Sequence, residues 1–358
     1  MLRLTKKRSG KSPSEQREMW ALEASKAKIT VGGFRFGKAD AAKLKVVSMN
    51  VYYGQVSGPD GTLSHPPIDV REYAALFETG ADVVAIQEAV LSALPKGSPI
   101  ANTAKSYAAR DAPGSDHWAR WTKRFPEGLF KTWWAGLKAV AKARGFLPLP
   151  PDGCGDAGSM YGQRFGNAVF VHAKRVQALG LPAPSAACVP RLLGRSEIKR
   201  YAGETEDRSA LAVHFGDRLT LINTHLSEKA TFSSKTGRST QRDMMASALK
   251  LRKKGRRTVV VGDFNKSDPT TVPPQVEPFY TVAYDADKDR DLYDLLRESG
   301  FACLPNDRAT AWNARHPDQV CSDFMTAKEL RKGVKILMPW SGTKVISDHA
   351  ALAFSVPV

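Results

Sequence analysis

Long apolar runs are missing from this sequence. No stretch of its 358 residues approaches the roughly 20 apolar residues that a membrane-spanning helix needs. The N-terminus, MLRLTKKRSGKSPSEQ, also lacks the continuous apolar core of a secretory signal. We therefore expect a soluble protein with no signal peptide and no transmembrane segment, located in the cytoplasm.

Cysteine is scarce, and its spacing excludes a common class of metal site. The four cysteines, Cys154, Cys188, Cys303 and Cys321, form no CxxC pair and have no histidines nearby in zinc-ligand register. For Cys303 and Cys321 we favour reduced cysteines over a disulfide. Cys303 and Cys321 are the pair that an oxidising environment would join.

Acidic residues are too few to balance the basic ones. The chain has 53 Lys+Arg against 36 Asp+Glu, a formal net charge of +17. This charge attracts polyanions, either nucleic acid or an anionic lipid surface. It indicates the kind of partner but not the reaction.

Internal repeats and interdomain linkers are also absent, which indicates one domain with additions. Residues 1–40 form a basic appendage with a short helix, and residues 41–358 form the domain. An insertion at about residues 91–165 holds Trp118, Trp121, Trp133 and Trp134 among basic residues. We favour a core-facing helix for Trp133 and Trp134 over a base-stacking role, and we expect a monomer.

Short β-branched runs alternate with helical segments from Lys43 onward. The runs are LKVVSMNVYY, DVVAIQEAV, NAVFVHAK, ALAVHF, LTLINTHL, TVVVGDFN, SDFMTA and ALAFSV. Helical periodicity marks residues 69–80 and 239–254. The pattern predicts an α/β fold in which two packed sheets mix parallel and antiparallel strands, with helices outside.

Polar residues suited to catalysis follow several of these runs. They are Asn50, Gln87, Glu88, Asn223, His225, Asp263 and Asn265. If the strands run the same way, these side chains gather at one edge of the sheets. Ser347, Asp348 and His349 instead precede the last run, so an antiparallel final strand would bring them to the same edge. Carboxylates with carboxamides suit Mg²⁺ or Mn²⁺, and histidines suit proton transfer.

The motifs SMN, IQE, NTHL, GDFN, SDF and SDH, in this order, resemble those of the endonuclease/exonuclease/phosphatase superfamily. This group includes DNase I, exonuclease III, abasic-site endonucleases, sphingomyelinases and inositol polyphosphate phosphatases. The resemblance covers roughly residues 44–357. It implies a four-layered sandwich of two mixed β-sheets flanked by helices, as in DNase I.

The resemblance also implies a metal site for Mg²⁺ or Mn²⁺. Glu88 matches the metal-binding glutamate, Asn50 the asparagine that supports it, and Asp348 a metal-linked aspartate. Tyr52 stands where many abasic-site nucleases have a further aspartate, so that acidic contact is missing.

Further matches imply catalytic roles. Asp263 matches the aspartate that activates water, and Asn265 the asparagine that binds the phosphate or the nucleophile. His349 matches the histidine on the scissile phosphate, Asp323 the aspartate that orients this histidine, and His225 the second histidine of the DNase I-like branch. The acidic partner of His225 has no match.

Two more positions match phosphate-binding residues of the superfamily. Asn167 corresponds to an active-site asparagine, and Arg208 falls where DNase I-like members have an arginine.

The superfamily cleaves several kinds of phosphate ester, so the charge of the chain has to suggest the substrate. The surplus of 17 positive charges favours nucleic acid, and DNA endonuclease activity is the leading expectation. The alternatives are a sphingomyelinase-like or inositol polyphosphate phosphatase activity, and an inactive protein that only binds. The basic residues expected beside the site are Arg164, Lys229, Lys235, Arg238 and Arg242.

Overall fold

The protein, described here from a computed structural model, is built on two mixed β-sheets. The structure describes residues 29–37, 42–51, 68–93, 127–156, 163–193, 208–227, 236–266, 268, 270, 286–305, 310, 318–341, 344–347 and 349–358. Four predicted features therefore lie wholly or mostly outside the described residues: Trp118, Trp121, Asp348 and most of the N-terminal appendage.

The first sheet has seven strands. Its order is β12 (Lys335–Leu337), β15 (Ala351–Pro357), β1 (Lys43–Asn50), β2 (Val83–Ala93), β5 (Gln163–His172) and β3 (Phe146–Pro148), with β4 (Cys154–Gly155) also on β5. Strands β1 and β2 are parallel, whereas β15 is antiparallel to β1, as the reversed order of the last motif predicts.

The second sheet has six strands. Its order is β10 (Ala302–Cys303), β11 (Asp318–Ser322), β9 (Arg257–Asp263), β8 (Leu219–His225), β7 (Ala210–Phe215) and β6 (Ser185–Val189). Strands β8 and β9 are parallel, so their polar ends lie side by side. A small ribbon pairs β13 (Trp340–Ser341) with β14 (Lys344–Val345).

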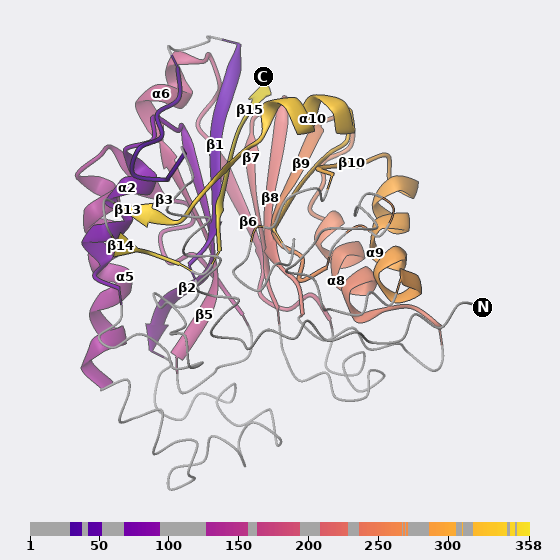
Figure 1. Cartoon of the computed structure of the whole chain (residues 1–358), viewed down its shortest axis with the longest axis horizontal. Helices are drawn as coiled ribbons and strands as arrows, with labels where there is room; N and C mark the ends of the chain where they lie inside the picture. The colour runs from indigo at the N-terminus through magenta and orange to yellow at the C-terminus, as the bar shows by residue number, and fades with distance from the viewer. Residues whose placement is uncertain are drawn as a thin grey trace, which may run out of the picture.

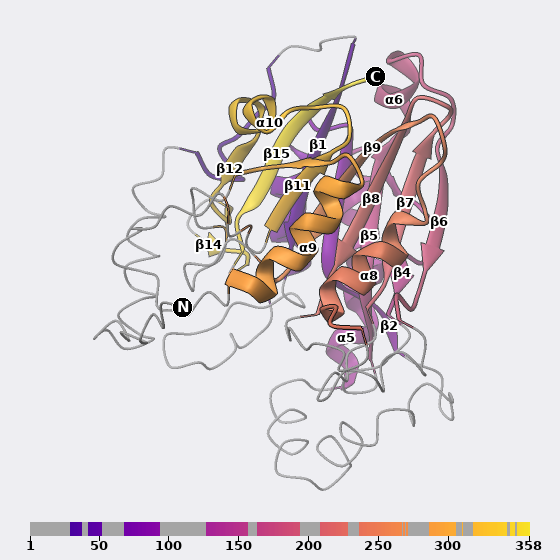
Figure 2. The same ribbon diagram turned by 90° about the vertical axis from the view of Figure 1, so that its right-hand side faces the viewer.

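Helices cover the outer faces of both sheets (Figures 1 and 2). The described helices are the 3₁₀ helix Val70–Tyr73, α2 (Ala74–Phe77), α5 (Glu127–Lys142), α6 (Ala173–Ala178), α8 (Thr240–Leu249), α9 (Ala286–Glu298) and α10 (Ala327–Gly333). Helices α6 and α10 do not cover an outer face, because Val176 and Leu330 belong to the apolar core between the sheets. Helices α2 and α5 pack on the first sheet, while α8 and α9 pack on the second. A third apolar core lies between the sheets. The predicted four-layered sandwich is confirmed.

Two further expectations can be compared with the helices. Trp133 and Trp134 of α5 are buried in the core beneath this helix, as predicted. Among the described residues, none of the helices has the length and apolar character needed to cross a lipid bilayer.

The cysteines differ from expectation. Cys154 and Cys188 form a disulfide that joins β4 of the first sheet to β6 of the second, and Cys303 and Cys321 form one between the neighbouring strands β10 and β11. The prediction that Cys303 and Cys321 are reduced is therefore wrong, and the Cys154–Cys188 bond was not predicted. Because disulfides are rare in cytosolic proteins, this finding also counts against the predicted cytoplasmic location.

Candidate active site

The inner faces of several strands change from apolar to polar toward one edge of the sandwich. Along β1 the inward series is Leu44, Val46, Ser48 and Asn50; along β8 it is Leu219, Leu221, Asn223 and His225; along β9 it is Val259, Val261 and Asp263. Because side chains alternate along a strand, one face of each strand supplies both the buried core and the site.

Strand β2 reaches this edge through a β-bulge. Its pairing with β5 passes from Ile86↔Ala168 directly to Ala89↔Gly166, so Gln87 and Glu88 both lie opposite Asn167. Glu88 has a positive φ of 54°, which residues other than glycine rarely adopt. This unusual backbone turns the Glu88 side chain toward the other polar residues.

Asn50 joins the two central carboxylates. Its Nδ2 donates to Glu88 Oε1 at 3.0 Å and to Asp263 Oδ2 at 2.9 Å. All three side chains are buried. Asn50 thereby joins two carboxyl groups of different sheets, and its role in supporting the metal ligand stays a prediction.

The end of β9 is shaped by Gly262. It has a φ of +136°, and a Cβ at this position would lie 1.8 Å from the carbonyl oxygen of Thr224. Only glycine permits this close approach of β9 to β8. The turn that follows is closed by Asp263, whose Oδ1 accepts the backbone N–H of Asn265 at 2.7 Å.

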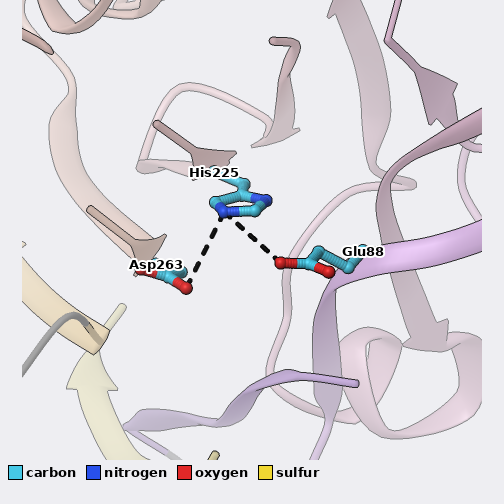
Figure 3. A group of neighbouring side chains, drawn as sticks. All are labelled: Glu88, His225 and Asp263. Atoms are coloured by element: carbon cyan, nitrogen blue, oxygen red, sulfur yellow. Dashed lines mark ion pairs between the residues drawn. The ribbon is translucent and has the colours of Figure 1, made fainter. Parts of the chain in front are cut away.

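His225 lies between the two carboxylates (Figure 3). Its Nε2 is 3.5 Å from Glu88 Oε1 and 3.7 Å from Asp263 Oδ2. Burial, followed by the charges of Arg208 and His349, lowers the pKa of His225 well below its ordinary value. The ring is therefore neutral at neutral pH.

The contacts of His225 indicate where its proton lies. Arg208 Nη1 is 3.1 Å from Nδ1, and Asn265 Nδ2 is 2.9 Å from Nε2. A neutral imidazole has one acceptor nitrogen, so both groups cannot donate to it at once. The charged guanidinium is the stronger donor, which places the ring proton on Nε2, facing the carboxylates, while Asn265 Nδ2 donates instead to the carbonyl of Leu226 at 2.9 Å.

His349 is oriented by a different aspartate from the one expected. Its Nδ1 lies 2.9 Å from Asp318 Oδ2, and its Nε2 lies 3.8 Å from Asp263 Oδ2. Asp323 instead accepts the backbone N–H of Thr258 at 2.7 Å. The assignment of Asp323 as the partner of His349 is therefore wrong.

The error follows from the position of one strand. We expected a strand at residues 322–327, but β11 covers Asp318–Ser322 and runs antiparallel to β9. In this register Asp318 pairs with Asp263, whereas Asp323 follows the other end of β11. A proline directly before Asp318 is the available signal, because proline commonly precedes or starts a strand.

Several buried oxygens of the site are unsatisfied. Among the described residues, Glu88 Oε2, Asp318 Oδ1 and Asn167 Oδ1 have no hydrogen-bond partner. Burial also raises the pKa of Glu88 to about 7, against the charge of Arg208 and the hydrogen bond from Asn50, and burial raises the pKa of Asp318. Buried carboxylate oxygens with no donor fit a divalent cation.

Two groups of potential ligands meet at Asp263. One is Glu88, His225 and Asp263, and the other is Asp263, Asp318 and His349; within each group the ligand atoms lie within 4.8 Å of one another. These buried groups could bind a metal ion. The predicted ligand Asp348 lies outside the described residues.

The two predicted phosphate-binding residues are both buried, but they differ in how their side-chain N–H groups are used. Asn167 Nδ2 donates to the carbonyl and the hydroxyl of Ser209, each at 2.9 Å. Its N–H groups are thus used between the sheets, which removes the basis for a phosphate-binding role. Arg208, next to Ser209, directs Nη1 at His225 and places a positive charge beside Glu88.

One of the basic residues expected beside the site also has another role. Arg242 forms ion pairs with Asp291 at 3.2 Å and Glu298 at 3.0 Å, joining α8 to α9. Arg238 is exposed just before α8. Lys229, Lys235 and the side chain of Arg164 lie outside the described residues.

Comparison of the sequence with protein-family models and with curated proteins found no match. Solved structures are similar. An endonuclease/exonuclease/phosphatase from Beutenbergia cavernae shares 18% identity over 88% of this chain and 72% of its own, with a TM-score of 0.49. An AP endonuclease from Archaeoglobus fulgidus shares 13% sequence identity over 88% of this chain and 99% of its own, with a TM-score of 0.45.

A 3′ phosphatase from Neisseria shares 12% identity over 88% of this chain and 99% of its own, with a TM-score of 0.44. The architecture of this chain, two mixed β-sheets flanked by helices, is the one that the resemblance of the sequence implied.

Proposed function

We propose that this chain is a Mg²⁺- or Mn²⁺-dependent phosphodiesterase that cleaves DNA internally. The observation that carries the proposal is the buried cluster in which Asn50 joins Glu88 to Asp263 while His225 and His349 face the same carboxylates. Acids, bases and an unsatisfied carboxylate oxygen at one edge suit the hydrolysis of a phosphate ester.

Glu88 and Asn50, with Asp348 as expected from the sequence, would hold the cation. A bound cation supplies positive charge that stabilises the negative charge developing on the phosphate. The Glu88 oxygen Oε2, which has no donor among the described residues, is the atom best suited to this role.

Asp263 is the base in this proposal. Its two oxygens are held in place by Asn50 and by the backbone of Asn265, so the carboxylate keeps one orientation when it accepts the proton of the attacking water. A rigid base loses little entropy on reaching the reactive geometry.

The two histidines then act on the phosphate from fixed orientations. Asp318 accepts a hydrogen bond from Nδ1–H of His349, and a second proton on Nε2 would make the ring cationic, so that Nε2–H would donate to a phosphate oxygen. His225, neutral and protonated on Nε2, donates a hydrogen bond from this nitrogen to the leaving oxygen, which takes its proton from water, while Arg208 keeps Nδ1 as the acceptor.

The choice of DNA is supported by the net charge of +17, since binding a polyanion releases counterions. We also infer that the protein works in an oxidising compartment, because both disulfides described above are rare in cytosolic proteins.

The test is nicking of supercoiled plasmid by purified protein with Mg²⁺ or Mn²⁺. We expect nicking that EDTA abolishes and that Asp263→Ala and His349→Ala lose. The exposed Asp217, which pairs with Arg256 at the other end of β9, gives the matched control Asp217→Asn, which should nick normally. If the plasmid stays intact and the protein hydrolyses sphingomyelin or inositol phosphates, then those compounds and not DNA are its substrates.

A further inference from the structure

Two buried amides connect the sheets directly behind the site. Asn223 of β8 donates from Nδ2 to the carbonyl of Ile86 on β2 at 2.9 Å and to that of Ala168 on β5 at 3.0 Å. Ile86 and Ala168 are the last regular pair before the bulge. Asn223 therefore contacts the first sheet at the point where its regular pairing stops.

Gln87 completes this connection from within the bulge. Its Nε2 donates to Asn223 Oδ1 at 2.5 Å and to Ser48 Oγ on β1 at 3.1 Å. Asn223 and Gln87 are fully buried. The pair therefore links β1, β2 and β5 of one sheet to β8 of the other.

The bulge decides where Glu88 points. Ile86 and Ala89 both belong to the apolar core beneath the helices, whereas Gln87 faces the other sheet. In a regular strand Glu88 would share the outward face of Ile86, and Ala89 would face inward. With the bulge, Gln87 and Glu88 both face the site, and Ala89 returns to the outer core.

We propose that Asn223 and Gln87 are positioning residues that hold the β2 bulge and thereby the ligand atom of Glu88. This inference rests on the proposed function for its link to metal binding. The positive φ of Glu88 persists because its surroundings favour it. On one side the backbone N–H of Val51 donates to the carbonyl of Gln87, and on the other Asn223 donates to the carbonyl of Ile86 and is itself held by Gln87.

The proposal also explains the position of Asn223 relative to His225. The two residues are two apart on β8, so both side chains face the first sheet. Strand β8 therefore supplies a catalytic histidine at its end and, two residues earlier, the amide that orients Glu88 on the facing sheet.

The test compares Asn223→Leu with a matched control on the same strand. Leucine has nearly the shape of asparagine and removes the bonds to both carbonyls. Thr220→Val removes another buried hydrogen bond of β8, to His214 at 3.0 Å, at the end away from the site. Gln87→Leu serves as a second variant, which keeps the bonds from Asn223 to the backbone.

The first readout is amide hydrogen exchange of residues 86–90 in the metal-free protein. We expect exchange there to be about tenfold faster in Asn223→Leu, and less accelerated in Gln87→Leu, while Thr220→Val stays at the wild-type rate. Wild-type exchange in both site variants would overturn the proposal. This readout needs neither metal nor substrate, so it decides the proposal even if the proposed function fails.

The second readout is calorimetric titration with Mn²⁺. We expect affinity to fall about tenfold or more in Asn223→Leu and to be retained in Thr220→Val, as for other groups that orient metal ligands. Equal losses in both variants would show a general loss of stability instead and would contradict positioning. If Asn223→Leu does not fold, the same comparison between Gln87→Leu and Thr220→Val decides the outcome.

Discussion

The two ends of strand β9 carry similar residue types in opposite surroundings. At its start, Arg256 pairs with Asp217, Asp323 accepts from Arg252 at 2.9 Å, and Arg257 lies over the ring of Phe324. At its other end, Asp263 lies beside another carboxylate and two histidines, all of them buried. Opposite charges are matched at one end, and like charges are gathered at the other.

The difference separates residues that stabilise the fold from residues that perform chemistry. Partly exposed ion pairs such as Asp217–Arg256 contribute about 1 kcal/mol or less to stability. Buried groups without sufficient donors have shifted pKa values and keep atoms available for a ligand, as Glu88 does. One strand can serve both purposes because its ends lie about 20 Å apart at roughly 3.3 Å per residue.

The largest expected effect is on turnover at the site end. Asp263→Ala and His349→Ala should each lower kcat by about 10³-fold, since each removes a proton-transfer or charge-stabilising group. The measurement is the rate of plasmid nicking at saturating Mg²⁺. A comparable loss of kcat in Asp217→Asn would contradict the assignment of catalysis to one end of β9 only.

A second prediction separates the two aspartates near the ends of β11. Asp318→Asn should lower kcat by about 100-fold, because the amide no longer holds His349 in its tautomer. Asp323→Asn should leave kcat unchanged but lower the free energy of unfolding by about 1–3 kcal/mol, because Thr258 and Arg252 lose an ionised acceptor. The kcat values and the urea unfolding curves of both variants check this prediction. A loss of kcat in Asp323→Asn and not in Asp318→Asn would restore Asp323 as the residue that orients His349.

The two disulfides allow a third comparison, between a bond across the sheets and a bond within one sheet. Their sequence separations of 34 and 18 residues predict a loss of about 3–4 kcal/mol in unfolding free energy for each. Cys154→Ser/Cys188→Ser should also lower activity, because Ser209, beside Arg208, donates to the carbonyl of Cys154. Cys303→Ser/Cys321→Ser should destabilise without lowering kcat, and equal kcat values for the two double variants would contradict this expectation.

A further expected effect concerns the stability of the metal-free protein. The pKa of Glu88 is raised to about 7 from an ordinary value of 4.5. Between these values the unfolded chain is ionised while the folded protein keeps its proton, so stability falls as pH rises from 4.5 to 7 and stays low above. Glu88→Gln should therefore stabilise the metal-free protein at pH 8 by up to roughly 3 kcal/mol.

Thermal unfolding at pH 5 and pH 8 in EDTA checks this prediction. The stabilisation by Glu88→Gln should be small at pH 5 and larger at pH 8. Addition of Mn²⁺ should stabilise the wild type and not the variant. A stabilisation that does not change with pH would show that Glu88 is not forced to hold a proton in the fold.

Sequence patterns were sufficient to predict much of the site. Apolar runs that finish in Asn50, Glu88, His225 and Asp263 placed these residues at one edge, and the reversed order at His349 implied an antiparallel last strand. Parallel strands bring their ends together whatever lies between them, so no detail of packing was needed for this inference.

Other features depended on details that local patterns do not contain. The choice of Asp318 over Asp323 depended on a shift of four residues in where β11 begins. The hydrogen bonds between Asn167 and Ser209 and the Cys154–Cys188 disulfide depended on which strands of the two sheets face each other. The Cys303–Cys321 disulfide depended on the pairing of β10 with β11. Contacts between residues far apart in sequence follow from sheet packing, which apolar periodicity leaves open.

The most direct measurement of the central claim is hydrolysis of bis(p-nitrophenyl) phosphate, a phosphodiester that belongs to no biological substrate class. The account predicts Mg²⁺- or Mn²⁺-dependent release of nitrophenol by the wild type, abolished by EDTA and lost in Asp263→Ala, and retained in Asp217→Asn. Release that is independent of metal, or equal in Asp263→Ala and the wild type, would contradict a phosphodiesterase site at this end of β9.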